Sequence, residues 1–136
     1  MSGTAATAAT ATVTLTGDNT LVEANDTVTV TLSADGETDV VVTTAALSAD
    51  DSLAAIAAAL ETAHAGGSDA KYAIDDTAAD GSFIITRSDG VNFTATVTAT
   101  EVAGGSDTLD VAATAVTSTN GVEAVDENTY EIVLTA

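Results

Sequence analysis

The sequence predicts an α+β fold that is mainly β, with antiparallel sheets or a sandwich and one helix, at about residues 48–65, packed on a face. Three observations predict it. A polar residue, usually threonine, alternates with an apolar one over residues 12–16, 27–32 and 91–99, which is the period of a half-buried strand. One stretch has helical spacing instead. An Asp-Gly pair, a strong hairpin signal, joins two extended segments.

The N-terminal part of the chain divides into an arm and a first set of strands. Residues 1–11 are low in complexity and are predicted to form a flexible arm, mobile unless a neighbour orders it, ahead of a single β-rich domain at residues 12–136. Residues 12–16 form a short alternating strand. The segments 27–34 and 38–44 are expected to pair antiparallel across the turn Ala34-Asp35-Gly36-Glu37.

The helix is predicted from the spacing of Leu53, Ile56 and Leu60, which places three large apolar residues on one face among alanines. Ser48 with Asp51 resembles a capping box at its start, and His64 lies near its end, just before a pair of glycines. This narrow apolar stripe suffices to lay one helix on a sheet.

The remaining chain reads as short strands. Residues 70–75 and 82–87 flank a turn, residues 91–101 alternate again, and strands near 108–117 and 129–135 complete the chain, separated by a turn at 119–121. Because the chain has no proline, long ladders need another protection at their edges, such as charge or partner strands. The alternating segments 91–100 and 129–135 are the predicted edges.

The charge balance excludes several classes of function. The chain of 136 residues has 2 Lys and Arg against 21 Asp and Glu, a net charge of −19, so direct binding to nucleic acid or to a membrane surface is not expected. With one histidine and no cysteine, most catalytic constellations cannot be assembled, and the chain is not expected to be an enzyme. Acidity of this kind is also typical of marine and halophilic proteins, which leaves an environmental explanation open.

No catalytic or cofactor-binding residue is predicted. His64 has no second histidine or cysteine to share a metal, and its place at a helix end favours a structural role. The four aromatic residues Tyr72, Phe83, Phe93 and Tyr130 are expected to be core anchors.

Calcium is the one cation for which the sequence offers oxygen ligands, in two acidic turns. These candidates lack the EF-hand spacing, so solvated acidic turns are the alternative. The candidate residues are Asp35, Glu37, Asp39, Asp75, Asp76 and Asp80.

The order of elements resembles two families. A hairpin, then a helix of sequence SADDSLAAIAAAL, then two short strands ending in FIITRSDG is similar to domains of phage virion proteins of the tail sheath, tail tube or head decoration type. It has a weaker similarity to the insert motif of flagellins and flagellar cap proteins. The resemblance covers about residues 12–100, but Thr62, Ala63 and His64 stand where the flagellar motif ends its helix in Ile-Asn.

This resemblance implies a structural subunit of a phage-like virion, a tail or capsid-decoration protein that acts by homomultimeric self-assembly. Its partners would be copies of itself and other virion proteins, and its location the virion, assembled in the host cytoplasm. An interior rich in alanine buries little area, and this also favours stabilisation by neighbouring copies. The alternatives are an extracellular binding or adhesion module of flagellar-filament or secreted-repeat type, and a hydrolase with a cryptic site.

Overall fold

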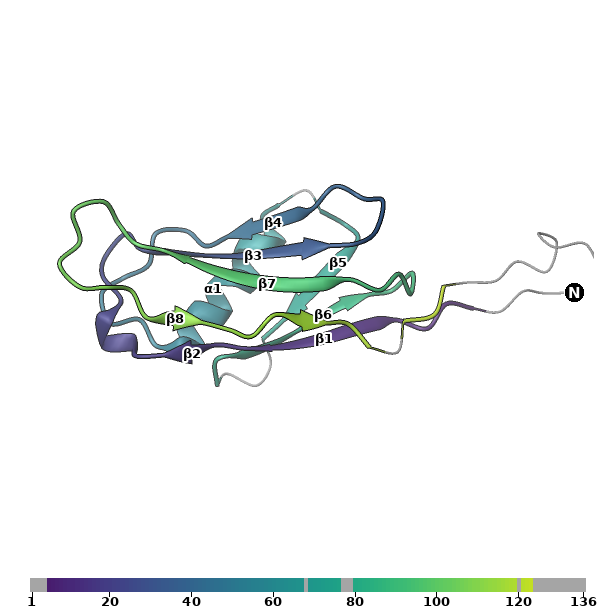
Figure 1. Cartoon of the computed structure of the whole chain (residues 1–136), viewed down its shortest axis with the longest axis horizontal. Coiled ribbons are helices and arrows are strands. Elements are labelled where there is room, and N and C mark those ends of the chain that lie inside the picture. The colour runs from purple at the N-terminus through teal and green to yellow at the C-terminus, as the bar shows by residue number, and fades with distance from the viewer. Residues whose placement is uncertain (1–4, 68, 77–79, 120, 124–136) are drawn as a thin grey trace, which may run out of the picture.

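The computed structural model describes residues 5–67, 69–76, 80–119 and 121–123, which fold into antiparallel sheets with one α-helix among these residues (Figure 1). The α+β, mainly β class predicted from the sequence is confirmed. The strands are β1 (Ala9–Thr14), β2 (Thr16–Gly17), β3 (Thr27–Ser33), β4 (Val40–Thr43), β5 (Tyr72–Asp75), β6 (Ser82–Arg87), β7 (Thr94–Thr100), β8 (Val111–Ala112) and β9 (Val116–Thr117), and the helices are the short 3-10 helix η1 (Asn19–Leu21) and α1 (Leu53–Ala65).

The larger sheet has the strand order β4-β3-β7-β9. The predicted hairpin is confirmed as β3 and β4, in which Val30 lies opposite Val42. Gly36 has a φ of 75°, and the Glu37 N–H donates to the Ala34 carbonyl at 3.1 Å. Asp35 has no positive φ and the last strand pair is Leu32 with Val40, so the connection is longer than the two-residue Asp-Gly turn. Strand β9 pairs with β7 at Thr94 and Ala95 alone, so the predicted edge at residues 91–100 is covered at its start, and among the described residues no strand pairs with the far side of residues 96–100.

The second sheet has the order β1-β6-β5, and a short pair, β2 with β8, extends the body at one end. Residues 116–119, with residues 121 and 122, join the two sheets along one side. Val116 and Thr117 pair with β7, and the chain then crosses to β1, where Thr119 exchanges backbone hydrogen bonds with Thr10 and Val122 with Thr7. On the opposite side, the sheets end in the unbonded edges of β4 and β5.

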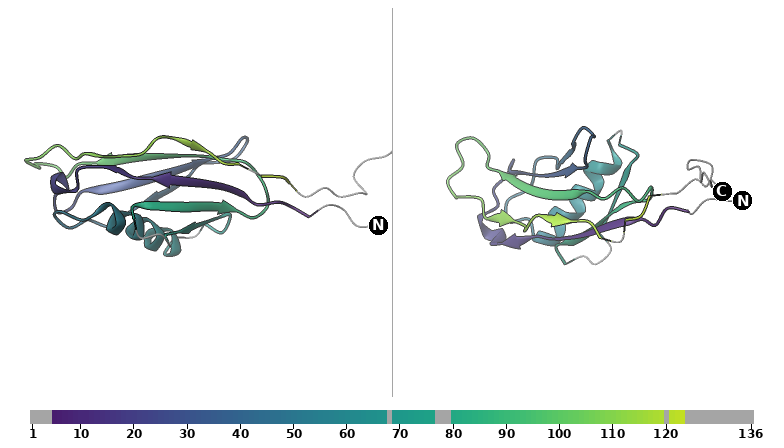
Figure 2. Two further views of the ribbon diagram at one scale, coloured as in Figure 1. Left: turned by 90° about the horizontal axis from the view of Figure 1, so that it is seen from below. Right: turned by 45° about the vertical axis from the view of Figure 1, so that its right-hand side comes forward.

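Helix α1 covers this open side, since it packs against β3, β4, β5 and β6 (Figure 2). It buries Ile56, Ala57 and Leu60, as its apolar stripe predicts. The expected start at residue 48 is wrong, because the Ser52 side chain accepts the N–H of Ala55 (3.1 Å) and is the N-cap. Ser48 instead forms a separate turn, in which its N–H donates to the Asp51 carboxylate.

The core lies between the two sheets and α1, and the longer strands contribute alternate residues to it. Tyr72, Phe83 and Phe93 are buried, as predicted for the aromatic residues, while Tyr130 lies outside the described residues, as does the predicted strand 129–135. The largest fully buried side chains are Phe83, Leu32, Ile56, Leu60, Ile85, Val13, Val22, Val28 and Val30, together with Asp26.

The predicted boundary of the N-terminal arm is also corrected. Residues 9–11 belong to β1, where Ala9 and Ala11 are buried against the core. A run of small residues with no bulky side chain fits a strand that packs closely against its neighbours, and the low complexity of the sequence hid this role. Residues 1–4 lie outside the described part of the chain.

Candidate functional site

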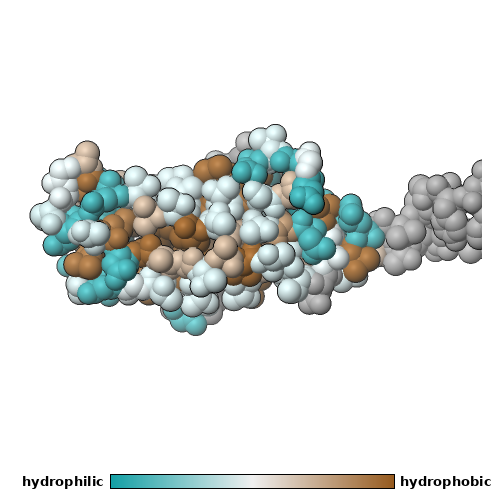
Figure 3. Space-filling model, viewed as in Figure 1, coloured by the Kyte–Doolittle hydropathy of each residue, from teal (hydrophilic) through white to brown (hydrophobic). Residues whose placement is uncertain are grey.

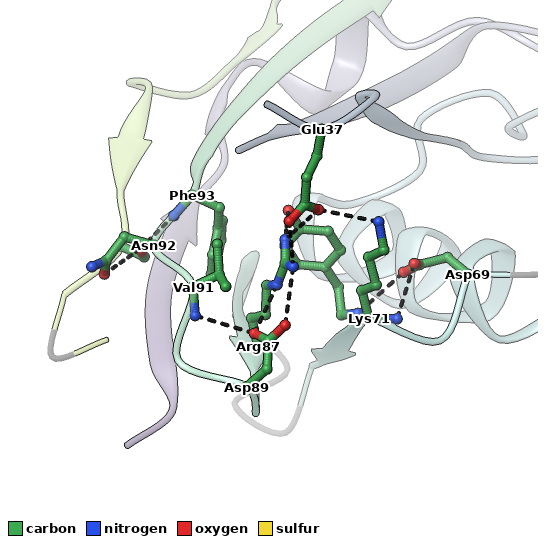
Figure 4. A network of polar contacts seen from close by, with 10 residues as sticks. Glu37, Asp69, Lys71, Arg87, Asp89, Val91, Asn92 and Phe93 are labelled. Carbon is green, nitrogen blue, oxygen red and sulfur yellow. Dashed lines mark hydrogen bonds and ion pairs between the residues drawn. The ribbon is translucent and has the colours of Figure 1, made fainter. Parts of the chain in front are cut away.

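The most highly connected polar group of the described chain is the guanidinium of Arg87, at the end of β6 (Figure 4). Its side chain is only 3% exposed. Nη1 and Nη2 donate to the two carboxylate oxygens of Glu37 at 2.8 and 2.7 Å, and Nε and Nη2 donate to Asp89 at 2.8 and 3.0 Å. Nη1 also donates to the Tyr72 hydroxyl at 3.1 Å. Two bidentate carboxylate pairs therefore neutralise one buried cation.

Strand register explains why an arginine is buried here. On β6, the inward-facing positions are Phe83, Ile85 and Arg87, and Tyr72 of β5 lies opposite Arg87. The Arg87 guanidinium carbon lies 5.2 Å from the centre of the Tyr72 ring, a cation–π distance. That ring meets Phe93 edge to face, with centroids 5.0 Å apart. The Arg87 guanidinium thus covers one end of the core, where it lies over the ring of Tyr72, which in turn contacts Phe93.

The ion pairs shift the pKa values of their members. The hydrogen bonds from Arg87, with a smaller contribution from Lys71, lower the pKa of Glu37 to about 2. The same guanidinium lowers the pKa of Asp89, and the two carboxylates, Glu37 first, raise the pKa of Arg87 further. All three groups stay ionised at neutral pH, so none of them is poised to exchange a proton in a reaction.

The other two basic side chains adjoin this network. Lys71 donates to Glu37 at 3.1 Å, and His64 Nε2 lies 3.0 Å from Asp69 Oδ2. Burial tends to raise the pKa of Asp69, but hydrogen bonds from His64 and from the N–H groups of Lys71 and Tyr72 outweigh it and lower the pKa. All the Lys, Arg and His residues of the chain therefore gather at one end, where they connect the β3–β4 turn to β5, β6 and the end of α1. The scarcity of basic residues was the one sequence signal for this network, which sequence reasoning missed.

The candidate calcium ligands do not form a shared site. Among the described residues, no three His, Cys, Asp or Glu side chains are grouped as metal ligands. Glu37 is engaged by Arg87, Asp39 accepts the Ser33 hydroxyl at 2.6 Å, and Asp80 accepts the N–H and hydroxyl of Ser82. Asp35 lines a cleft, Asp75 is exposed at the end of β5, and Asp76 donates its N–H to Glu61 at 2.7 Å.

Many other carboxylates hold the loops by accepting backbone N–H groups. Asp26 is fully buried, and it accepts the N–H of Glu23 and of Val102 at 2.7 Å each. Glu23 in turn accepts the N–H groups of Ser106 and Asp107, which lowers its pKa. By accepting backbone N–H groups, these carboxylates restrict the conformations of the loops, a role that proline and disulfides have in other proteins.

Two open hollows adjoin the network. A cleft of about 430 Å³ lies between the β3–β4 turn and the start of β7, and its acidic wall comprises Asp35, Glu37 and Glu123. A groove of about 590 Å³ lies between β4 and the C-terminal end of α1; Val40 and Val42 line one side, and Ala63, His64, Asp69 and Lys71 line the other. The Ser33 hydroxyl on the cleft wall donates to Asp39 of the groove lining, and the groove alone offers an exposed cation, Lys71, among the described residues.

The outer face of the larger sheet is free of charge. Asp75 is the one acidic residue on any described strand, and it belongs to the smaller sheet. Across β4, β3 and β7, the outer face has a row Thr43-Thr29-Thr98 and a row Val41-Thr31-Thr96. Figure 3 shows this face with the hydrophilic residues gathered at its two ends and threonine and apolar residues between them.

Comparison with known proteins found no match to the chain among protein-family models, curated proteins or solved structures. No helix in the described part of the chain is long and apolar enough to cross a membrane. The assignment of a function therefore depends on the geometry given above.

Proposed function

We propose that the protein is a structural subunit that assembles with copies of itself, as a tail or capsid-decoration component of a phage-like virion. The observation that carries this proposal is the uncharged outer face of β4, β3 and β7 in a chain of net charge −19. A charge-free region is favourable on a surface that meets a copy of the same acidic protein, because like charges facing each other across an interface repel.

The chemistry of the ion-pair network supports a structural role. Arg87 has its hydrogen-bonding groups directed to Glu37, Asp89 and Tyr72, so the network fixes the shape of one end of the subunit. In this proposal the protein is not an enzyme, its partners are copies of itself and other virion proteins, and its acidic loops keep it from binding nucleic acid. The location that follows is the virion.

The salt dependence of assembly tests the proposal. Between about 10 mM and 150 mM salt, the screening length falls from about 30 Å to about 8 Å, so repulsion between acidic copies weakens. We expect light scattering and electron microscopy of the full chain to show larger assemblies as salt rises. A T98E variant, which charges the outer face, should lower the assembled fraction at least tenfold, and T114E, which charges an exposed loop residue, should not.

A second candidate, an extracellular module carried on a filament or a larger protein, is favoured by a different observation. The antiparallel bridge between Thr7 and Val122 places the incoming and outgoing segments of the domain side by side at one end (Figure 1). Such a module needs no contact between its own copies. A particle that remains monomeric at every salt concentration would support this candidate and reject self-assembly.

A further inference from the structure

Strand β4 has one unpaired edge. The Thr44 N–H donates to the Val28 carbonyl at 2.9 Å, which makes residues 28 and 44 a hydrogen-bonded pair. By the alternation of an antiparallel ladder, Val40 and Val42 then bond to β3, and the N–H and C=O groups of Val41 and Thr43 point away from it. No other described segment pairs with this edge. The Val41 side chain is 61% exposed, so an uncovered apolar residue lies at the same edge.

The groove of about 590 Å³ runs beside this edge. One wall is β4, and the other is formed by Ala63 and His64 of α1 and by Asp69 and Lys71 before β5. A strand added to β4 would continue the sheet, and its inward side chains would lie beside Val40 and Val42, next to Ala63. Strand addition of this kind takes its affinity from main-chain hydrogen bonds and its specificity from alternate side chains.

The chain contains a segment with the required pattern outside the described residues. In residues 129–135, Tyr130, Ile132 and Leu134 alternate with Thr129, Glu131, Val133 and Thr135. Each large apolar side chain that leaves water contributes about 1.5–3 kcal/mol, a considerable amount in a chain so poor in bulky apolar residues. This stretch contains one acidic residue, Glu131, and two more, Asp126 and Glu127, precede it.

We propose that residues 129–135 of a second copy add to the free edge of β4 and fill this groove. The inference rests on the proposed self-assembly and adds a contact at the edge of the larger sheet to the one that its outer face makes; the assembly needs both. Lys71, whose side chain is 52% exposed, is the one exposed Lys or Arg in the described chain. It lines the groove together with Asp39 and Asp69, and it can attract Asp126 and Glu127, the acidic residues that precede the strand of a neighbour.

The direction of the chain favours a neighbour over the same molecule. Glu123, after which the segment begins, lines the same cleft as Asp35 and Glu37 of the β3–β4 turn. From that end, the molecule's own strand would run along β4 in the same direction as β4, whereas every strand pair in the described residues is antiparallel. A second copy can present its strand antiparallel. Where two copies exchange strands, the contact closes a dimer; where the strand passes from copy to copy, it builds rings or filaments.

Two variants of the full chain separate the acceptor edge from the donor strand. V41P removes the outward N–H of β4 and leaves the β3 ladder intact, because Val41 does not bond to β3. I132P breaks the donor strand. We expect sedimentation velocity in 0.5 M NaCl to show each variant alone as a monomer, while an equimolar mixture forms a one-to-one dimer in which V41P donates and I132P accepts. The matched variants V41T and I132V keep the N–H groups and should assemble like the wild type.

A labelled peptide of residues 127–136 provides the second measurement. It should bind I132P, whose groove is vacant, at least tenfold more tightly than V41P. Where V41P does not fold, as judged by circular dichroism, K71E replaces it, and the reversed charge should weaken peptide binding at least fivefold.

The remaining outcomes overturn the inference or the function separately. If the wild type assembles and both proline variants assemble equally well, the strand site is wrong and self-assembly stands. If the wild type is monomeric and the peptide binds I132P but not the wild type, the molecule's own strand fills the groove. If the wild type is monomeric in all salt concentrations and the peptide binds neither protein, both the strand site and the proposed function fail.

Discussion

Arg87 and Glu37 lie 50 positions apart in the sequence and meet through two parallel hydrogen bonds of 2.8 and 2.7 Å. This pair joins the β3–β4 turn of one sheet to the end of β6 in the other. Because the guanidinium is buried and the carboxylate is 27% exposed, the pair is shielded from water more than a surface ion pair is. The Arg87–Glu37 pair therefore explains how the two sheets keep a fixed relation although the core between them is thin.

Removal of the buried cation should be far more costly than removal of the exposed one. R87M removes the buried cation, leaves Asp89 without its Arg87 partner and leaves Glu37 with Lys71 alone, and we expect the free energy of unfolding to fall by about 1.5–3 kcal/mol. K71Q removes the exposed partner of the same carboxylate and should cost less than about 1 kcal/mol. Urea denaturation measures both. Equal losses in the two variants would contradict the central role given to Arg87.

Acid should weaken the protein through Glu37. Its pKa is about 2 in the folded protein against an ordinary value of 4.5, so its contribution to stability is complete above pH 4.5 and is lost as the pH falls towards 2. Protonation of other carboxylates relieves the repulsion of the negative chain and acts in the opposite direction. Comparison with E37Q isolates the effect: urea midpoints between pH 5 and pH 2.5 should fall more steeply in the wild type. Parallel curves would show that the pair does not govern acid stability.

The N-cap of α1 can be assigned by paired serine substitutions. S52A removes the hydroxyl that accepts the Ala55 N–H, and we expect a loss of about 1 kcal/mol in the free energy of unfolding. S48A should be nearly neutral, since Ser48 uses its backbone N–H in the turn with Asp51 and not its side chain. Thermal unfolding followed by circular dichroism measures both. A larger loss in S48A would restore the helix start predicted from the sequence.

Alanine substitutions at two glycines with the same φ separate the cost of a left-handed backbone from the cost of a steric collision. Gly90 and Gly104 each have a φ of 81°, but a Cβ on Gly104 meets nothing within 4 Å, whereas one on Gly90 would collide with the Val122 carbonyl and lie 2.8 Å from the Thr7 carbonyl oxygen. G104A should cost about 1 kcal/mol for the left-handed conformation. G90A should add about 1–3 kcal/mol for overpacking. Equal losses in urea denaturation would reject the close packing of residues 7, 90 and 122.

The sequence by itself determined the fold class, the β3–β4 hairpin, the pair β5 and β6, and the buried face of α1. Each depends on local periodicity, or on a turn whose residues permit few conformations, and such signals are complete within about ten to fifteen residues. The helix start was misplaced because Ser48 and Ser52 both precede suitable residues, and only packing selects between them.

Tertiary structure alone decided the rest. The burial of Ala9 in β1, the pairing of β7 with β3 and the crossing of residues 116–119 between the sheets depend on pairings between distant segments, which no local pattern specifies. The candidate site likewise depends on contacts between segments that are distant in the sequence. Glu37, Tyr72 and Arg87 come from three separate segments, and their meeting is favourable because a buried charge is stable only where the fold brings its partners to it.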